Sequence, residues 1–385
     1  MATYVAPAYT QYSGIWNISS QANAKAAGTW PAPIAGLFTW GNNGTGQLGL
    51  GNISYYSSPK QVGALVTWAK INAGNSFATA IKTDGTLWVW GQGGSGRLGL
   101  GNTTYYSSPK QVGSLTDWSL TAPNGAHCLA IKTDGTLWAW GLNNGGQLGN
   151  GTIANTSSPI QIGALTTWSK ISAGNSCSFA IKTDGTLWSW GGNGSGYLGL
   201  NNRTSYSSPK QVGSLTNWSE IVAGSNQIFA IKTDGTLWSW GDNPYGGLGL
   251  GNTTYYSSPK QVGSLTTWSK VTSGQYQAMA ITTSGTLWSW GYNQIGRLGL
   301  GNTTNYSSPK QVGALTNWSQ ISFASTSAKS IKSDGTLWTW GAGQDGQSGL
   351  GNTTDYSSPK QVGSLTSWTA VSSGCGGSFV MAKIG

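Results

Sequence analysis

The sequence predicts an all-β fold, a seven-bladed β-propeller built from four-stranded blades. A block that reads Ile-Lys-Thr-Asp-Gly-Thr-Leu-Trp-Ser-Trp-Gly at 181–191 returns in nearly the same form every fifty residues. The Trp-Gly pair that ends the block occurs seven times, and a second tryptophan, first seen at Trp68, also recurs seven times. A strict period of this length indicates one repeat architecture in place of several unrelated domains.

Residues 1–36 do not follow the repeat and are expected to form a separate leader, while the propeller spans 37–385. Within the leader, 19–27 has the composition of a short helix, with a serine as N-cap and Gly28 as the stop. Trp16 and Trp30 are candidate residues for docking the leader on another protein. The alternative is that the leader packs on the side of the propeller.

Strand-like segments recur in each copy. In the second copy we expect strands near 68–72, 77–82, 86–91 and 108–112. The first copy begins at Leu37 and lacks the strands that should precede Phe38, whereas the residues after Trp368 supply such strands and then stop. We therefore expect the amino- and carboxyl-terminal strands to share one blade, which closes the ring and removes exposed sheet edges.

The repeated block predicts a β-hairpin. Asp184-Gly185 is the two-residue loop that a type I′ turn prefers. Because side chains alternate along a strand, Trp188 and Trp190 point to the same face. Each buried indole removes roughly 150–250 Å² from water, an upper bound of about 4–6 kcal/mol. We expect contacts between neighbouring copies to supply this burial and to hold the fold together.

Charge and composition narrow the range of functions. The formal net charge is +10, and the lysines behind it recur in Pro-Lys-Gln-Val and in Ile-Lys-Thr, so the charge is spread round a ring. A solvated surface is favoured over nucleic-acid binding, with anionic glycan or phosphate binding as the alternative. No apolar run reaches the length of about 18 residues that a membrane helix needs, so no membrane insertion is expected. The amino terminus lacks the features of a secretory signal, which predicts a cytoplasmic protein or one released by lysis.

The sequence contains no recognisable catalytic, metal or cofactor motif. Its three cysteines fall in different copies, without disulfide or metal spacing. His127 is the only histidine and Glu220 the only glutamate, and the turn aspartates come one per copy, too far apart for a carboxylate pair. The glycine-rich stretch at 191–196 is not followed by a helix, which excludes a phosphate-binding loop. We expect a protein that is not an enzyme and carries no cofactor or metal.

The run Ala-Ile-Lys-Thr-Asp-Gly-Thr-Leu-Trp-x-Trp-Gly-x-Asn-x-x-Gly-x-Leu-Gly-Leu, found at 180 and at 230, resembles the repeat of the regulator of chromosome condensation family. The resemblance covers roughly 37–385 and implies a seven-bladed β-propeller. It implies less about function, because members serve as exchange factors, ligase subunits, inhibitors and adhesins.

Some features of that family have no counterpart in the sequence. The basic amino-terminal tail and the inserted β-wedge of the eukaryotic exchange factor are missing, so the chain looks more like a phage or bacterial member. The histidine that the family often places before the second strand survives only as His127, and Gly377 stands at the corresponding place in the last copy.

Two loops differ among the copies, near 75–79 and 92–97 in the second copy, while the Thr-Asp-Gly turn scarcely changes. The strand directions place both loops at one end of the hairpin, so we predict a single variable face that binds a ligand. The alternative is unconstrained drift. The candidate ligand-binding residues are Arg97, Tyr197, Tyr245, Tyr276, Tyr292, Arg297 and Asp345. Tyr105, Tyr255 and their equivalents also vary, and the sequence leaves their face open.

These observations predict a non-enzymatic recognition protein. We expect a phage virion component, on the tail or the capsid surface, that binds a host-surface glycan or protein through the variable face. Its leader resembles Trp-Pro-ending leader segments of phage tail and virion proteins and would contact other virion proteins. Such a chain would be found in the virion, or outside the cell after lysis. The alternative is an intracellular regulator, a propeller that binds a GTPase or chromatin.

Overall fold

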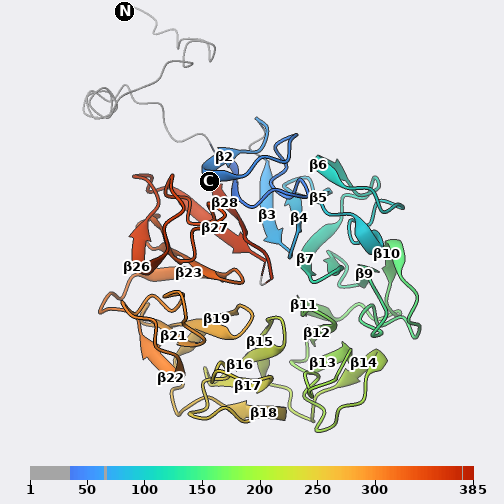
Figure 1. The fold of residues 1–385 in the computed structure, drawn as a ribbon. Coiled ribbons are helices and arrows are strands. Elements are labelled where there is room, and N and C mark those ends of the chain that lie inside the picture. Colours follow the sequence, from blue (N-terminus) through green and yellow to red (C-terminus); the bar gives the residue numbers. More distant parts are fainter. Residues whose placement is uncertain (1–34, 65–66, 375) are drawn as a thin grey trace, which may run out of the picture. The chain divides into compact units, whose positions relative to one another are not determined.

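The computed structural model describes residues 35–64, 67–374 and 376–385 of the chain. The leader, with its expected helix and the candidate docking residues Trp16 and Trp30, lies outside the described residues. The described residues form seven antiparallel sheets of four strands each, arranged in a ring (Figure 1). The predicted all-β, seven-bladed propeller is confirmed.

Each blade holds four strands, ordered from the centre of the ring outward. The innermost strands are β3 (Trp68–Ala73), β7 (Trp118–Asn124), β11 (Trp168–Ala173), β15 (Trp218–Ala223), β19 (Trp268–Ser273), β23 (Trp318–Phe323) and β27 (Trp368–Ser373). The second strands are β4 (Phe77–Lys82), β8 (His127–Lys132), β12 (Cys177–Lys182), β16 (Gln227–Lys232), β20 (Gln277–Thr282), β24 (Ser327–Lys332) and β28 (Phe379–Ile384).

The outer half of each blade is equally regular. The third strands are β1 (Gly36–Gly41), β5 (Leu87–Gly91), β9 (Leu137–Gly141), β13 (Leu187–Gly191), β17 (Leu237–Gly241), β21 (Leu287–Gly291) and β25 (Leu337–Gly341). The outermost strands are β2 (Tyr56–Gln61), β6 (Tyr106–Gln111), β10 (Thr156–Gln161), β14 (Tyr206–Gln211), β18 (Tyr256–Gln261), β22 (Tyr306–Gln311) and β26 (Tyr356–Gln361). A short 3-10 helix, η2 (Gly94–Gly96), lies in the loop between β5 and β6.

Blade 1 is the sheet β3-β4-β5-β6, and blades 2 to 6 follow in chain order. The closing blade has the order β2-β1-β28-β27, so its outer two strands come from the start of the propeller and its inner two from the end. The register of β1 on β28 places Phe38 opposite Ala382. The predicted closure of the ring is confirmed. The innermost strands of all the blades line a central cavity of about 300 Å³.

The register of the closing blade corrects one expectation. Phe379 lies opposite Gly41 in the way that His127 lies opposite Gly141. The position assigned to Gly377 therefore belongs to Phe379. The reason is a longer loop before the last strand, which runs over 374–378 where its counterpart in blade 1 runs over 74–76.

The hairpin turns do not have the expected type I′ geometry. Gly185 has a φ of +76°, but Asp184 is not among the described residues with positive φ. Gly185 N donates to the carbonyl of Lys182 at 3.0 Å, and Lys182 N donates to the carbonyl of Thr186 at 3.0 Å. This is a type I turn followed by a left-handed glycine. The carboxylate of Asp184 accepts bonds from N and Oγ1 of Thr186 at 2.9 and 2.6 Å, which stabilises the ordinary backbone conformation of the aspartate.

Residues from each pair of neighbouring blades form one hydrophobic cluster. Between blades 3 and 4, Phe179 packs with Trp218 and Trp240 of the next blade. The Trp-Gly tryptophans are fully buried, and the indole N–H of Trp190 donates to the carbonyl of Gln147 in the preceding blade at 2.9 Å. Contacts between copies therefore supply the core, as the sequence predicts.

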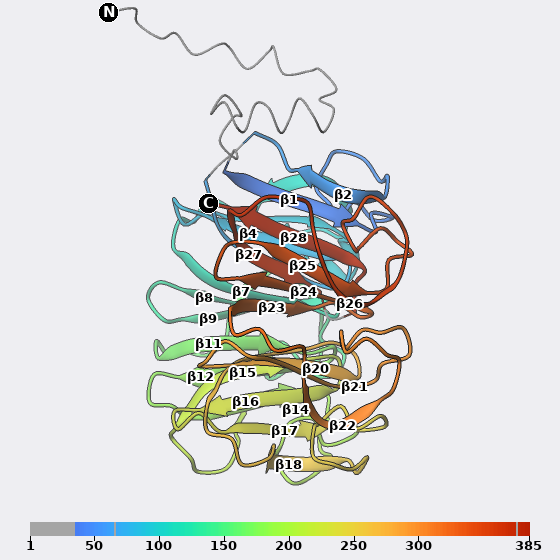
Figure 2. The ribbon, with the colours of Figure 1, turned by 90° about the vertical axis from the view of Figure 1, so that its left-hand side faces the viewer.

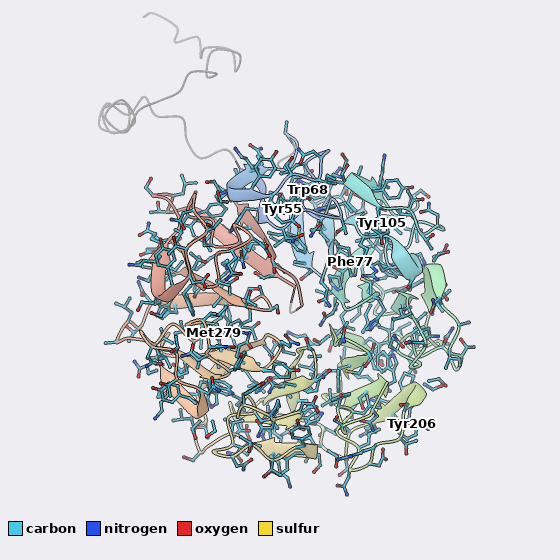
Figure 3. The ribbon with its side chains drawn as sticks, viewed as in Figure 1. Tyr55, Trp68, Phe77, Tyr105, Tyr206 and Met279 are labelled. Atoms are coloured by element: carbon cyan, nitrogen blue, oxygen red, sulfur yellow. The ribbon has the colours of Figure 1, made fainter. Side chains whose placement is uncertain are left out.

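The outermost strands carry features that protect a sheet edge. Tyr206 lies at the periphery of the ring (Figure 3), and the ammonium of Lys210 lies 5.4 Å from the centroid of its ring. Similar lysine and tyrosine pairs recur on five other outer strands. Pro209 stands between the two residues in the sequence. Lysine and proline on an edge strand oppose pairing with a second chain, which gives these lysines a structural role at the rim.

The two ends of the propeller carry different loops, and Figure 2 shows the strands from the side. The loops 74–76 and 92–105 of blade 1 lie at the same end, where Gln92 N donates to the carbonyl of Ser76 at 2.9 Å. We name this end of the ring, with the equivalent loops of all blades, the loop face. The Thr-Asp-Gly turns and the linkers between blades lie at the other end, the turn face. The variable loops therefore share one face, as predicted, but residues 77–79, which the sequence assigned to the first variable segment, belong to β4 and are buried.

Candidate binding site on the loop face

A buried asparagine holds the long loop in place in blades 2 to 5 and in the closing blade, whereas blades 1 and 6 have glycine at this position. In blade 4, Asn243 Nδ2 donates to the carbonyls of Asn252 and Thr254 at 2.9 and 3.1 Å. Its Oδ1 accepts a bond from the backbone N–H of Leu248 at 2.9 Å, and both Asn243 and Leu248 are fully buried. The loop is therefore a rigid platform, and the residues between the anchors project from it.

Variation on this platform is concentrated at a few positions. The residue after the Trp-Gly pair differs in all seven copies: Asn42, Gln92, Leu142, Gly192, Asp242, Tyr292 and Ala342. On the turn face, by contrast, Leu115 is 45% exposed, yet leucine occupies its position in all seven copies. Exposure alone therefore does not decide which positions vary. The turn face also has a position that varies, with Asp117, Thr167, Asn217 and Ser367 in different copies, so variation is not confined to the loop face.

Four candidate residues meet at the boundary between blades 4 and 5. The rings of Tyr245 and Tyr292 stack with centroids 4.4 Å apart and an interplanar angle of 29°. Tyr276 contacts Tyr245 edge-on at 5.4 Å, and the guanidinium carbon of Arg297 lies 4.6 Å from the centroid of Tyr292. Tyr245 is 39% exposed, which makes it the most accessible of the four. We name Tyr245, Tyr276, Tyr292 and Arg297 the tyrosine cluster.

The two arginines at equivalent positions have different surroundings. Arg97 donates from Nε to the carbonyl of Gly94 at 2.9 Å and from Nη1 to Gln92 Oε1 at 2.8 Å. Arg297 donates from Nη1 to the carbonyl of Ser325 at 3.1 Å, and its Nε is buried without a partner. Burial lowers the pKa of both arginines.

The remaining candidates lie outside the cluster. Tyr197 packs against the core between blades 3 and 4, and its carbonyl accepts the indole N–H of Trp240 at 2.7 Å. Asp345 lies in blade 6, where its backbone N–H donates to Gln347 Oε1 at 2.8 Å. Arg97 lies in blade 1. The structure thus brings together four of the seven candidate residues and disperses the other three among different blades.

Two residues near the cluster were not among the candidates. Tyr255 is 46% exposed, and its position lies on the loop face, because the equivalent Tyr105 accepts a hydrogen bond from Gln92 at 3.1 Å. Burial and the nearby charge of Asp242 raise the pKa of Tyr255. Asp242 itself is buried and accepts a hydrogen bond from Asn226 at 3.0 Å. The signal for Asp242 was present in the sequence, since its position differs in every copy.

His127 and Cys128 are titratable groups buried in the core. His127 is fully buried beside Ser178 Oγ, at 2.9 Å from its Nε2, and burial lowers its pKa to about 3. Burial raises the pKa of Cys128. In the part of the chain that the structure describes, no group of three or more His, Cys, Asp or Glu residues could hold a metal ion. Among the same residues, no helix has the length and apolar character needed to cross a membrane.

A family model of the RCC1-like domain matches residues 127–382, more than half of the chain. The chain belongs to the RCC1-like domain family. Two models of the regulator of chromosome condensation (RCC1) repeat also match this RCC1-like propeller, one at residues 36–81 and 84–131 and the other at 68–97. The predicted family resemblance is confirmed. Comparison with the curated proteins finds no match.

Three solved structures, two of which contain the same yeast protein, are similar in fold to this RCC1-like propeller. Prp20p of Saccharomyces cerevisiae, described with its binding to Gsp1p and histones, is 18% identical with a TM-score of 0.81, over 92% of each chain. Human WBSCR16 is 19% identical with a TM-score of 0.81, over 91% of this chain and 98% of that one. A structure of Kap60 bound to yeast RCC1 (Prp20) matches at 18% identity and a TM-score of 0.81, over 100% of this chain and 96% of that one. At identities this low, the similarity shows a common fold and nothing about function.

Proposed function

We propose that this RCC1-like propeller binds a protein partner through its loop face, with the tyrosine cluster at the centre of the contact. The observation that carries the proposal is the stacking of Tyr245 on Tyr292, at 4.4 Å, across the boundary of two blades. Tyrosine and arginine dominate protein interfaces, because they offer a large amphipathic area at a small cost in conformational entropy. The rigid loop platform lowers that cost further.

An intracellular regulator is the class of protein that best fits this proposal. Prp20p is described as binding Gsp1p and histones, and yeast RCC1 is found in complex with Kap60, so propellers of this fold bind protein partners. This support is stronger than that for a virion component. The predicted virion role depends on the leader, which lies outside the described residues, and it stays a prediction, as do the glycan ligand and the location of the protein.

We further propose that the chain acts by binding and not by catalysis. The described histidine is fully buried, and the aspartates of the Thr-Asp-Gly turns each cap their own hairpin, as Asp184 does through Thr186. The exposed groups of the tyrosine cluster stack on one another and make no nucleophile and base pair. Such an arrangement suits contact area and directional hydrogen bonds.

Selection of binders from a peptide display library on the wild-type propeller tests the proposal. The selected peptides should lose about tenfold or more in affinity for the double variant Tyr245→Ala/Tyr292→Ala. The matched control is Tyr55→Ala/Tyr105→Ala, which removes two exposed tyrosines of the same face from other blades. Equal binding to both double variants would contradict the proposal. Histone binding that only the first variant loses would identify a chromatin-binding regulator, whereas binding on a glycan array would favour an adhesin.

A further inference from the structure

Arg297 is a buried cation with no described counter-ion. Its side chain is 6% exposed, and the ion pairs among the described residues are Lys132 with Asp117 and Lys170 with Glu220. A buried charge is normally paired, because removing an ion from water is costly. Among the described residues, the guanidinium contacts the carbonyl of Ser325 and the ring of Tyr292, and neither carries a full negative charge.

Part of the guanidinium is also left without hydrogen bonds. Only Nη1 of Arg297 donates to a described acceptor, the carbonyl of Ser325. Nε is buried and unpartnered, and no described residue accepts a bond from Nη2. The guanidinium carbon lies 4.6 Å from the centroid of the Tyr292 ring, and Nη2, which unlike Nε is not fully buried, is left for a ligand.

Arg97, the equivalent arginine of blade 1, also lacks a described counter-ion, but its guanidinium has hydrogen-bond partners that Arg297 lacks. Arg97 donates to Gln92 Oε1 at 2.8 Å, and also to the carbonyls of Gly94 and Gly125. Tyr292 occupies in blade 5 the position that Gln92 occupies in blade 1. The tyrosine replaces a hydrogen-bond acceptor by an aromatic ring, so that Arg297 loses the internal partner that Arg97 keeps.

We propose that Arg297 receives a carboxylate of the protein partner, an aspartate or glutamate side chain that enters the tyrosine cluster beside Tyr292. The proposal rests on the proposed function, since it concerns the same surface. The carboxylate would pair with Nη2 of the guanidinium through a charge-assisted hydrogen bond. Tyr245 and Tyr276 would then cover the apolar part of the same partner segment.

The charge of the site selects this anion over phosphate or sulfate. The loop-face segments of blades 4 and 5, at 242–255, 274–276 and 292–305, contain no cation except Arg297. A doubly charged group is usually met by several cations, whereas a carboxylate matches a single guanidinium. Asp242 is the only acidic residue of these segments, and the described ion pairs do not include it.

Arg297→Gln is the decisive variant, and Arg97→Gln is its matched control. Glutamine already occupies the equivalent position as Gln47, Gln147 and Gln347, so the fold accepts it. Peptides selected on the wild-type propeller should be enriched in Asp or Glu at one position. Replacing that residue by its amide should weaken binding to the wild type and to the Arg97→Gln protein about tenfold. The same replacement should leave binding to the Arg297→Gln protein unchanged.

The possible failures can be told apart. The selected peptides can depend on Tyr245 and Tyr292 and yet carry no acidic residue. Alternatively, replacing the acidic residue by its amide can weaken binding to the wild type and to Arg297→Gln by the same factor. Either result shows that the carboxylate pairing is wrong, while the proposed function stands. If no selected peptide depends on the two tyrosines, the proposed function fails and this inference fails with it. Thermal unfolding of Arg297→Gln controls for folding, and its midpoint should be no lower than that of the wild type, because an unpaired charge is removed.

Discussion

Gly149 of blade 2 lies directly against the indole of Trp190 in blade 3. A Cβ added at Gly149 would lie 2.7 Å from Nε1 of that indole, which itself donates to the carbonyl of Gln147 at 2.9 Å. The same close contact between a glycine and the next Trp-Gly indole occurs at all seven boundaries. The indole also donates to a carbonyl of the preceding blade at six of these boundaries, the exception being Trp340, whose Nε1 has no partner among the described residues. The glycine contact leaves no room for a side chain at any of the seven.

Gly149→Ala should destabilise the propeller. The substitution forces a methyl group into the indole, at a backbone φ of +80° that suits glycine. We expect the free energy of unfolding to fall by about 2–4 kcal/mol, measured by denaturant titration. Gly194→Ala is the control, because a Cβ there meets nothing within 4 Å, and it should change stability by less than about 0.5 kcal/mol. Equal stability of the two variants would show that the contact between Gly149 and Trp190 can relax to accept a side chain.

Substitution of Trp240 should lower the stability of the fold, whereas substitution of the nearby Tyr245 should affect binding and leave stability almost unchanged. Trp240 is fully buried between blades, so Trp240→Ala should cost about 3–5 kcal/mol of unfolding free energy. Tyr245 is largely on the surface, and Tyr245→Ala should cost no more than about 1 kcal/mol. Chemical denaturation of both variants checks this difference. A large loss in the Tyr245 variant would assign the tyrosine cluster to the core of the fold.

Lys329 should make stability depend on pH above neutrality. It is fully buried, donates to Ser327 Oγ at 2.8 Å, and burial lowers its pKa to about 7. The unfolded chain keeps this proton up to pH about 10.4, so stability should fall as the pH falls from there to about 7, and this group should have no further effect below that. Lys329→Met, by analogy with Met279, should be more stable than the wild type by about 2–4 kcal/mol at pH 7. Denaturant midpoints that differ as much at high pH as at pH 7 would contradict this.

His127 should make the stability of the folded protein depend on pH in the acid range. Its pKa in the folded protein is about 3, below the ordinary value of 6.5, because burial disfavours the charged ring. Between these values the unfolded chain takes up a proton that the folded chain does not, so stability should fall as the pH falls from 6.5 toward 3. His127→Gln, as found at Gln227 and Gln277, should flatten this part of the profile. The urea midpoint, measured against pH in both proteins, tests the assignment, and equal acid slopes would refute it.

Much of the fold could be predicted because its signals are local. The strand expected at 77–82 is observed as β4 over the same residues, and the fifty-residue period gave the number of blades. The type I′ turn predicted at Asp184 is wrong. The hydrogen bonds between Thr186 and the carboxylate of Asp184 favour a type I turn with a single left-handed glycine. The equivalence of Gly377 failed for a different reason, a loop length that no strand pattern reveals.

The sequence by itself determined the repeat, the closing blade and the end of the ring at which the loops vary, because these follow from period, alternation and strand direction. Only the tertiary structure decided that Tyr245 stacks on Tyr292 and that Nε of Arg297, unlike Nε of Arg97, has no described hydrogen-bond partner. Arg97 and Arg297 occupy equivalent positions, and each donates to a carbonyl 28 residues further on. Sequence spacing cannot distinguish them. Their difference arises from the side chains that surround each guanidinium at the boundary between blades.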